Sequence, residues 1–234
     1  MEETEHPVCD PIQEKRRQTM INRIEKIYSP QDPGVALKVQ QGHFATPHSH
    51  VTHYFDLTTL RTRVSEAQSA ARILASQWDK SRPVDTIVCI DGMEVVGAFL
   101  AEQLLAASVP SMNAHETIYV TAPEKNGQGG FAFGESRIPL IRRKNVLILA
   151  GAITTGQTVR SCMDAVRCCE GIPEGICSVF SALRRVSETT VYTLFTAGQV
   201  ADYRSSSGAE CVQCMAGKKL DATVNGEGYF CLRR

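Results

Sequence analysis

The sequence predicts an α/β fold with a mainly parallel central sheet flanked by helices and a small N-terminal hood. Short apolar runs rich in β-branched residues, such as 85–90 and 145–150, are typical of buried strands. Helical segments separate these runs, and strand–helix alternation requires crossover connections and hence parallel strands. No linker or internal repeat divides the chain, so its 234 residues are expected to form one domain.

Within that domain we expect three parts. Residues 1–58 would form an N-terminal helix and the hood, residues 59–200 the α/β core, and residues 201–234 a C-terminal tail that carries a Cys-x-x-Cys motif. The helix is predicted over 12–28 because apolar residues recur among charged ones at Ile12, Met20, Ile21, Ile24 and Ile27.

The remaining elements follow from local patterns. A break at 29–34 separates the first helix from strands at 35–44 and 54–57, which flank a histidine-rich bend. An Ala-, Glu- and Gln-rich helix covers 60–78 and stops at Ser81-Arg82-Pro83. Beyond it we expect strands at 85–90, 117–121, 145–150, 175–182 and 191–196, helices at 94–107 and 155–169, and a mobile loop or long hairpin at 122–135.

Composition excludes several classes of protein. Lys plus Arg and Asp plus Glu both total 25, so net charge gives no argument for binding nucleic acid or a membrane surface. No segment stays apolar for the roughly 18 residues of a membrane span, and the acidic N-terminus lacks the apolar core of a signal peptide. Nine cysteines, an odd number scattered through apolar segments, indicate reduced thiols. We therefore expect a cytoplasmic protein.

One turn carries the functional argument. The apolar strand 146–150 leads through residues 151–158 into a helix, and ligands of open α/β sheets bind at the carboxyl ends of strands. The free N–H groups of a helix N-terminus, the hydroxyls of Thr154, Thr155 and Thr158 and the small Gly156 suit a phosphate monoester. Without a Gly-Lys-Ser/Thr sequence this is not a Walker loop. The alternative is an ordinary threonine N-cap.

The same turn resembles the phosphoribosyl-pyrophosphate motif of type I phosphoribosyltransferases: an apolar strand, two acidic residues, two apolar residues, then Thr-Thr-Gly-x-Thr/Ser. Further stretches resemble orotate phosphoribosyltransferase in the right order across roughly residues 40 to 217. They are Gly42-His43-Phe44 with Tyr54-Phe55-Asp56, residues 84–104, residues 125–130 and residues 211–217.

This resemblance implies transfer of a phosphoribosyl group from phosphoribosyl pyrophosphate to a pyrimidine base such as orotate, with Mg²⁺ as cofactor. It also implies a homodimer whose ligands are small molecules. Thr154, Thr155, Gly156, Gln157 and Thr158 would hold the 5′-phosphate. Asp91 and Gly92 would line the pyrophosphate side, and Tyr54 and Phe55 would lie near the base. The catalytic loop would contribute Lys125 and, beside it, Glu124.

The sequence departs from the family at central positions. The acidic pair of the motif is Ala150-Gly151, and Val120, Thr121 and Glu124 stand at basic positions of the loop. Losing preorganised charge at a developing charge costs orders of magnitude in rate. A catalytically weak or inactive nucleotide-binding regulator is therefore the alternative, and transfer to another base remains a third. Asp91, Glu94 and Glu124 could each hold Mg²⁺.

Histidines and cysteines leave a second question open. His48, His50 and His53 lie close together with His43 nearby; they could contact pyrophosphate or the base, but no cysteine or carboxylate beside them completes a tetrahedral zinc site. Cys211 and Cys214 could be half of a zinc knuckle or a redox pair, yet no second half follows them. Reduced thiols in a packed tail are the simplest interpretation.

Overall fold

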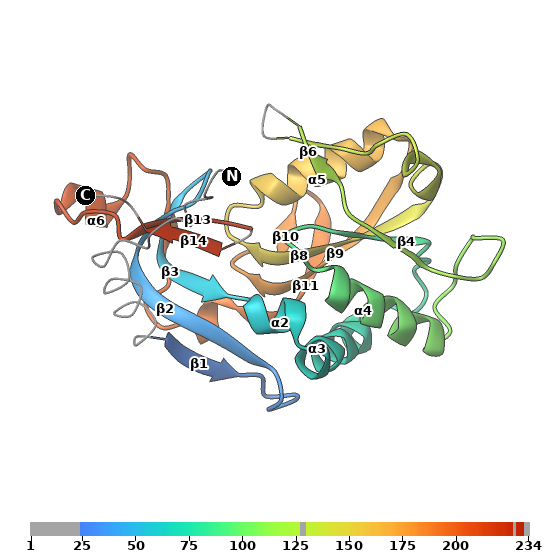
Figure 1. Ribbon diagram of the computed structural model, residues 1–234, viewed down its shortest axis with the longest axis horizontal. Coiled ribbons are helices and arrows are strands. Elements are labelled where there is room, and N and C mark those ends of the chain that lie inside the picture. The colour runs from blue at the N-terminus through green and yellow to red at the C-terminus, as the bar shows by residue number, and fades with distance from the viewer. Residues whose placement is uncertain (1–23, 127–129, 227, 232–234) are drawn as a thin grey trace, which may run out of the picture.

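The computed structural model describes residues 24–126, 130–226 and 228–231, in which two six-stranded sheets lie side by side (Figure 1). The central six-stranded sheet contains β4 (Thr86–Cys89), β5 (Tyr119–Thr121), β8 (Asn145–Ile153), β9 (Ile172–Ser181), β10 (Arg185–Val186) and β11 (Thr189–Thr196). Its order is β10-β11-β9-β8-β4-β5, and every pair except β10–β11 is parallel. The predicted mainly parallel central sheet is confirmed.

Helices cover both faces of this sheet. On one face lie α2 (Thr58–Thr62), α3 (Val64–Gln77) and α4 (Glu94–Ala106), while α5 (Gln157–Cys168) lies on the other (Figure 1). Buried residues of α3 recur at helical spacing, for example Ala67, Ala70, Ala71 and Leu74. Because β8 is sandwiched between the two layers, seven of its nine residues are buried. Its apolar sequence follows from that position.

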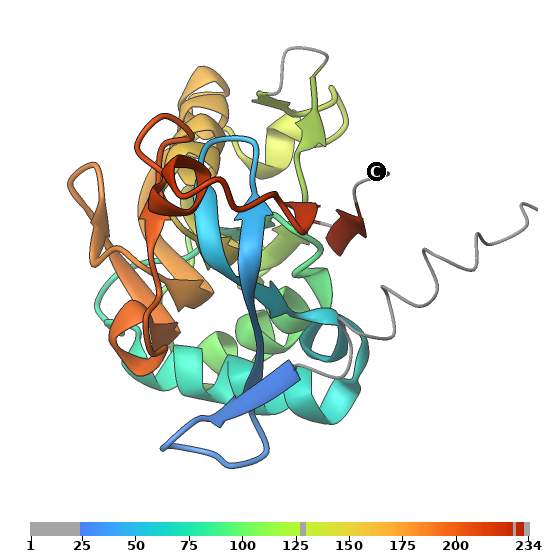
Figure 2. The same ribbon diagram turned by 90° about the vertical axis from the view of Figure 1, so that its left-hand side faces the viewer.

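The other six-stranded sheet is the hood. Its strands are β1 (Ile24–Tyr28), β2 (Ala36–Ala45), β3 (His50–Asp56), β12 (Ser205–Ser206), β13 (Ala222–Asn225) and β14 (Gly228–Cys231). They are ordered β12-β3-β2-β13-β14, with β1 also paired to β2 (Figure 2). The chain after 201, which includes the short helix α6 (Val212–Met215), thus returns to complete the hood that the N-terminal strands begin.

Two local predictions are corrected. Residues 24–28, the end of the expected helix, form strand β1, which pairs antiparallel with β2 from Ile24 opposite Gln40 to Tyr28 opposite Ala36. Isoleucine and tyrosine favour strands, and the edge of β2 supplies the hydrogen-bond partners. The rest of that helix lies outside the described residues. The histidine-rich bend is shorter than expected, because His50 and His53 belong to β3.

The glycine-rich segment 122–135 contains a short antiparallel hairpin. Its strands are β6 (Glu124–Lys125) and β7 (Phe131–Ala132), and residues 127–129 lie outside the described part. Single 3₁₀ turns follow at Ile138–Leu140 and Ala197–Gln199.

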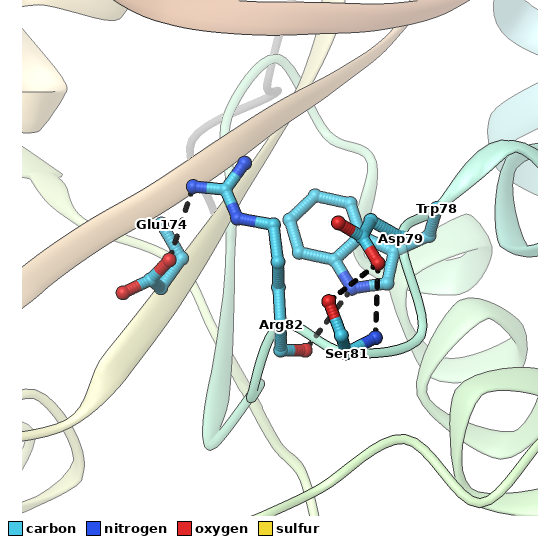
Figure 3. A network of polar contacts seen from close by, with 5 residues as sticks. All are labelled: Trp78, Asp79, Ser81, Arg82 and Glu174. Atoms are coloured by element: carbon cyan, nitrogen blue, oxygen red, sulfur yellow. Dashed lines mark hydrogen bonds and ion pairs between the residues drawn. The ribbon is translucent and has the colours of Figure 1, made fainter.

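A polar network fixes the connection between α3 and β4 (Figure 3). The backbone N–H and hydroxyl of Ser81 both donate to the Asp79 carboxylate, at 3.0 and 2.7 Å. The Arg82 guanidinium lies 5.6 Å from the Trp78 ring centre and 3.0 Å from the Glu174 carboxylate. A side chain at Gly175 would come within 2.5 Å of that ring, so glycine lets β9 approach the tryptophan. The network ties the entrance of β4 to β9.

Candidate functional site

A cleft lies between the hood and the carboxyl ends of β4 and β8. The hood contributes residues of β3 and of the connection between β2 and β3, and the turn of the C-terminal hairpin contributes a third wall. The central domain contributes the ends of two strands and the start of two helices. The lining comprises Thr46, Pro47, His48, Val51, His53, Tyr54, Phe55, Leu57, Arg61, Asp91, Ala152, Thr154, Thr158, Val224, Asn225 and Gly226.

The turn that the sequence singled out forms the floor of this cleft. Helix α5 starts at Gln157, its N-cap is Gly156, and no side chain caps it among the described residues. Thr154 and Thr158 line the cleft from either side of that N-terminus. The ordinary threonine N-cap would require a side-chain hydrogen bond to the first turn, which is absent here. The first-turn N–H groups therefore face a site suited to an anion.

Gly156 is required by the local backbone. Its φ of +77° lies in the left-handed region, where side chains are strained. A Cβ at this position would also come within 3.1 Å of Val186 and 3.2 Å of Leu183. The sharp turn between β8 and α5 thus depends on the absence of a side chain.

Asp91 lies at the end of β4, directly beside β8. It and Gly92 form a turn with φ values of 60° and 71°. Its carboxylate accepts a hydrogen bond from the Gly151 N–H at 3.3 Å. Burial raises the pKa of Asp91, while the Gly151 N–H and the positive charges of Arg61 and Lys125 act in the opposite direction. The cleft therefore holds a carboxyl group whose charge depends on its neighbours.

The position of Asp91 bears on the replacement of the motif's two acidic residues by Ala150-Gly151. Ala150 is fully buried among apolar side chains on the α5 side of the sheet. A Cβ at Gly151 would come within 2.9 Å of Leu57 and 3.2 Å of the Asp91 Cβ. Asp91 thus fills the space beside Gly151 where a side chain from β8 would project.

Arg61 is a site residue that the sequence analysis missed. It belongs to α2, lines the cleft, and its buried Nε has no hydrogen-bond partner within the described part of the chain. A buried polar group without a partner is costly unless a ligand satisfies it. No sequence signal marked Arg61, because an arginine at the start of an amphipathic helix is ordinary.

Tyr54 and Phe55 both line the cleft but have different neighbours. The Phe55 ring packs against Phe180 at 4.0 Å between ring centres, inside the main core. The Tyr54 ring meets Tyr229 edge-on at 5.2 Å. Burial, with a smaller effect of the Asp56 charge, raises the pKa of Tyr54 to about 12. Tyr54 is therefore a neutral aromatic wall at physiological pH.

Other predicted residues do not line this cleft. Glu124 is exposed and pairs with Arg137 at 3.3 Å. Lys125 is also exposed on the hairpin, although its charge acts on Asp91. Gln157 faces a second groove, which lies between α5 and the β6–β7 hairpin. Gly92 and Thr155 flank the lining residues, and the Thr155 carbonyl accepts a hydrogen bond from the Arg160 guanidinium at 3.1 Å.

The histidines divide into two groups. His48 and His53 line the cleft, and burial lowers the pKa of His53. His43 and His50 instead face each other away from it, 5.3 Å apart between ring centres. Of the three carboxylates considered for Mg²⁺, Asp91 lines the cleft, whereas Glu94 and Glu124 are exposed outside it.

Comparisons with known proteins give structural neighbours. No family model and no curated protein matches the sequence. The chain is similar to adenine phosphoribosyltransferase from Thermoanaerobacter pseudethanolicus, with 14% identity and a TM-score of 0.48 over 77% of this chain and 99% of that one. It is also similar to adenine phosphoribosyltransferase from Trypanosoma brucei in complex with AMP, pyrophosphate and ribose-5-phosphate. The identity is 14% and the TM-score 0.47, over 87% of this chain and 91% of that one. For Mycobacterium tuberculosis orotate phosphoribosyltransferase in complex with phosphoribosyl pyrophosphate, the identity is 15% and the TM-score 0.44, over 63% of this chain and 83% of that one.

Two further findings concern membrane-spanning helices and the cysteines. None of the helices in the described ranges is both long and apolar enough to cross a membrane. The seven cysteines whose side chains are described, Cys89, Cys162, Cys168, Cys169, Cys177, Cys211 and Cys214, are free thiols.

Proposed function

We propose that the cleft binds a phosphoribosyl compound and that the chain transfers its phosphoribosyl group from phosphoribosyl pyrophosphate to a pyrimidine base such as orotate. The observation that carries this proposal is the uncapped N-terminus of α5, flanked by Thr154 and Thr158 at the floor of the cleft. Backbone N–H groups and hydroxyls at a helix N-terminus match a phosphate monoester. The choice of a pyrimidine rests on the motifs that resemble orotate phosphoribosyltransferase.

In this reaction the bond between C1 of the ribose and pyrophosphate breaks, and a base nitrogen forms the new bond to C1. Positive charge develops on the sugar, so a nearby carboxylate lowers the barrier. Asp91, beside Gly151, would supply that charge in place of the missing acidic pair. Arg61 would contact the phosphate oxygens, and Tyr54 would form an aromatic wall for the base.

Mg²⁺ fits the cleft only with help from the substrate. Mg²⁺ is usually held by one or two carboxylates together with substrate phosphates, and Asp91 is the one carboxylate lining the cleft among the described residues. When bound, the ion would neutralise the departing pyrophosphate. We further propose that the protein acts as a homodimer in the cytoplasm, with Lys125 and Glu124 on a loop that closes over the ligand.

A second candidate is a binding protein without turnover. It is favoured by the buried Ala150 and by Glu124, which stands at a basic position of the family's loop and pairs with Arg137. The same phosphate seat serves both candidates.

Calorimetry and turnover assays test the proposal together. We expect phosphoribosyl pyrophosphate with Mg²⁺ to bind wild-type protein and Thr158→Val to weaken binding about tenfold or more, because one hydrogen bond to a charged group is lost. Orotate absorbance would fall only when phosphoribosyl pyrophosphate is present. Binding without loss of orotate would favour the regulator. Absence of any binding heat would overturn both candidates.

Moving the carboxylate separates the two candidates further. Ala150→Asp with Gly151→Asp tests whether the family's pair restores activity, but side chains at 151 collide with Leu57 and Asp91. The variant Gly151→Asp with Asp91→Ala relieves part of that collision. An enzyme that relies on Asp91 should lose turnover in Asp91→Ala alone and regain part of it in the combined variant.

A further inference from the structure

Four potential metal ligands meet on the side of the hood away from the phosphate seat. His43 lies in β2, His50 in β3, and Cys211 and Cys214 at the start of α6. Their ligand atoms, one from each residue, all lie within 4.8 Å of one another. His43 and Cys211 are buried, His50 is half-buried and Cys214 is exposed. The missing half of the Cys-x-x-Cys motif is therefore two histidines that lie far upstream, with His43 168 residues before Cys211 and His50 164 residues before Cys214. No local pattern in the sequence links residues so far apart.

The spacing of these atoms fits a tetrahedral ion. His43 Nε2 and His50 Nδ1 are 3.3 Å apart. Nitrogen–sulfur distances are 3.4 Å from His43 to Cys211, 3.5 Å from His43 to Cys214 and 3.2 Å from His50 to Cys214. Zinc bonds of about 2.3 Å to sulfur and 2.0–2.1 Å to nitrogen place tetrahedral ligands about 3.3 Å (N–N) and about 3.5 Å (N–S) apart. The observed distances agree with these values.

Hydrogen bonding alone explains the cluster less well. His43 Nε2 lies within 3.5 Å of three other ligand atoms, yet a ring nitrogen has only one proton or one lone pair to share. A cation at the centre satisfies all four groups at once.

The surroundings prepare His43 and Cys211 for coordination. His43 Nδ1 lies 2.9 Å from the Lys218 carbonyl, which can only accept, so Nδ1 carries the proton and Nε2 keeps its lone pair for a metal. The backbone N–H of His43 also donates to the Asp221 carboxylate at 2.8 Å. Cys211 is buried beside His43, with its sulfur 3.4 Å from His43 Nε2.

We propose that His43, His50, Cys211 and Cys214 bind one zinc ion as a structural site. Four protein ligands complete the tetrahedron, which leaves no open position for catalysis. The ion would join β2 and β3 to the segment that leads into β13, whose Val224 and Asn225 line the cleft. Zinc would thus hold the C-terminal wall of the cleft in place. The site stands whether or not the cleft transfers a phosphoribosyl group.

Metal analysis of the purified full chain tests this site without any cleft ligand. We expect one zinc per chain in protein purified under reducing conditions without chelator, and a tetrahedral thiolate spectrum when cobalt(II) replaces zinc. Cys214→Ser and His50→Ala should each lose the ion. Cys168→Ser is the matched control, because Cys168 is an exposed free thiol on α5, and it should keep one zinc.

The wild-type protein keeps the test decisive if a variant fails to fold. Adding zinc after mild chelation should raise the melting temperature, since an ion that binds the folded state stabilises it. Wild-type protein that contains no zinc, shows no tetrahedral cobalt spectrum and gains no stability from zinc would overturn the site. A disulfide between Cys211 and Cys214 in freshly purified protein would overturn it as well.

Discussion

At the scale of single residues, Arg61 and Asp91 are the charged groups that line the cleft. Arg61 has a buried Nε without a partner in the described chain, and the Asp91 carboxylate accepts a backbone hydrogen bond from Gly151. The protein thus leaves the Arg61 Nε unsatisfied and keeps the Asp91 carboxyl group buried beside the cleft. Such groups are costly for stability and are typical of ligand sites.

Arg61→Ala should weaken binding of phosphoribosyl pyrophosphate by about 10- to 100-fold, because a charged hydrogen bond contributes about 1.5–3 kcal/mol. Calorimetry measures the change. Arg63→Ala is the matched control: Arg63 is two residues away, its side chain is 67% exposed, and it pairs with Glu66. Equal losses in both variants would contradict a specific role for Arg61.

Asp91→Asn should raise the free energy of unfolding at neutral pH by about 1 kcal/mol while weakening Mg²⁺-dependent binding. Burial raises the pKa of Asp91 above its ordinary value of 3.8, so the folded state is favoured when the carboxyl is protonated. That contribution is complete below the unfolded-state pKa and disappears as pH rises through the folded-state pKa.

Urea denaturation at several pH values checks this prediction. The gain of Asp91→Asn over wild type should be smallest in acid and should grow as pH increases through the folded-state pKa. A gain that does not vary with pH would mean that Asp91 does not titrate as its burial suggests.

At the scale of elements, the turn between β8 and α5 forms the proposed phosphate seat. β8 carries apolar residues through Ile153, and α5 begins four residues later at Gln157. The three residues between them must turn sharply and leave the helix N-terminus open. Gly156 allows both features. Glycine adopts a φ of +77° without strain, and it has no side chain that could cap the helix.

Gly156→Ala should destabilise the fold by about 1–2 kcal/mol from backbone strain alone and more from contact with Val186 and Leu183. It should also abolish phosphate binding, since the N–H groups shift. Gly217→Ala is the control: its φ is +70°, but no atom lies within 4 Å of its added Cβ. Retained ligand affinity in Gly156→Ala would contradict the assigned seat.

At the scale of the molecule, the cleft is where the hood meets the central sheet. A ligand that contacts Thr154 and Thr158 from below and Tyr54 and His48 from above would join the two sheets. Binding to the folded state alone would then stabilise both, by about 2.7 kcal/mol at a hundredfold excess over Kd.

Hydrogen exchange with phosphoribosyl pyrophosphate and Mg²⁺ should therefore show joint protection of residues 46–48 in the hood and 154–158 in the core. Strand β1 pairs with the opposite end of β2 and contributes no lining residue, so its amides should exchange unchanged. Protection confined to residues 154–158 would show that the hood takes no part in binding.

The core strands and the Thr-Thr-Gly turn before α5 could be predicted from the sequence because their causes are local. Residues 146–150 are apolar and β-branched in a continuous run, and the Thr-Thr-Gly turn follows them directly. The end of the predicted N-terminal helix was wrong because the strand character of Ile24–Tyr28 depends on pairing with β2. The partner strand is nearby in sequence, but the pairing itself leaves no periodic signal within residues 24–28.

The sequence by itself therefore determined the α/β class, the order of strands and helices in the core and the position of the turn before α5 that we propose as the anion seat. Only the tertiary structure decided that Arg61 faces the cleft, that Asp91 fills the space beside Gly151, and that His43 and His50 meet Cys211 and Cys214. The reason is physical: propensity and apolar periodicity act over a few residues, whereas these contacts arise where the C-terminal segment completes a sheet begun by the N-terminal strands.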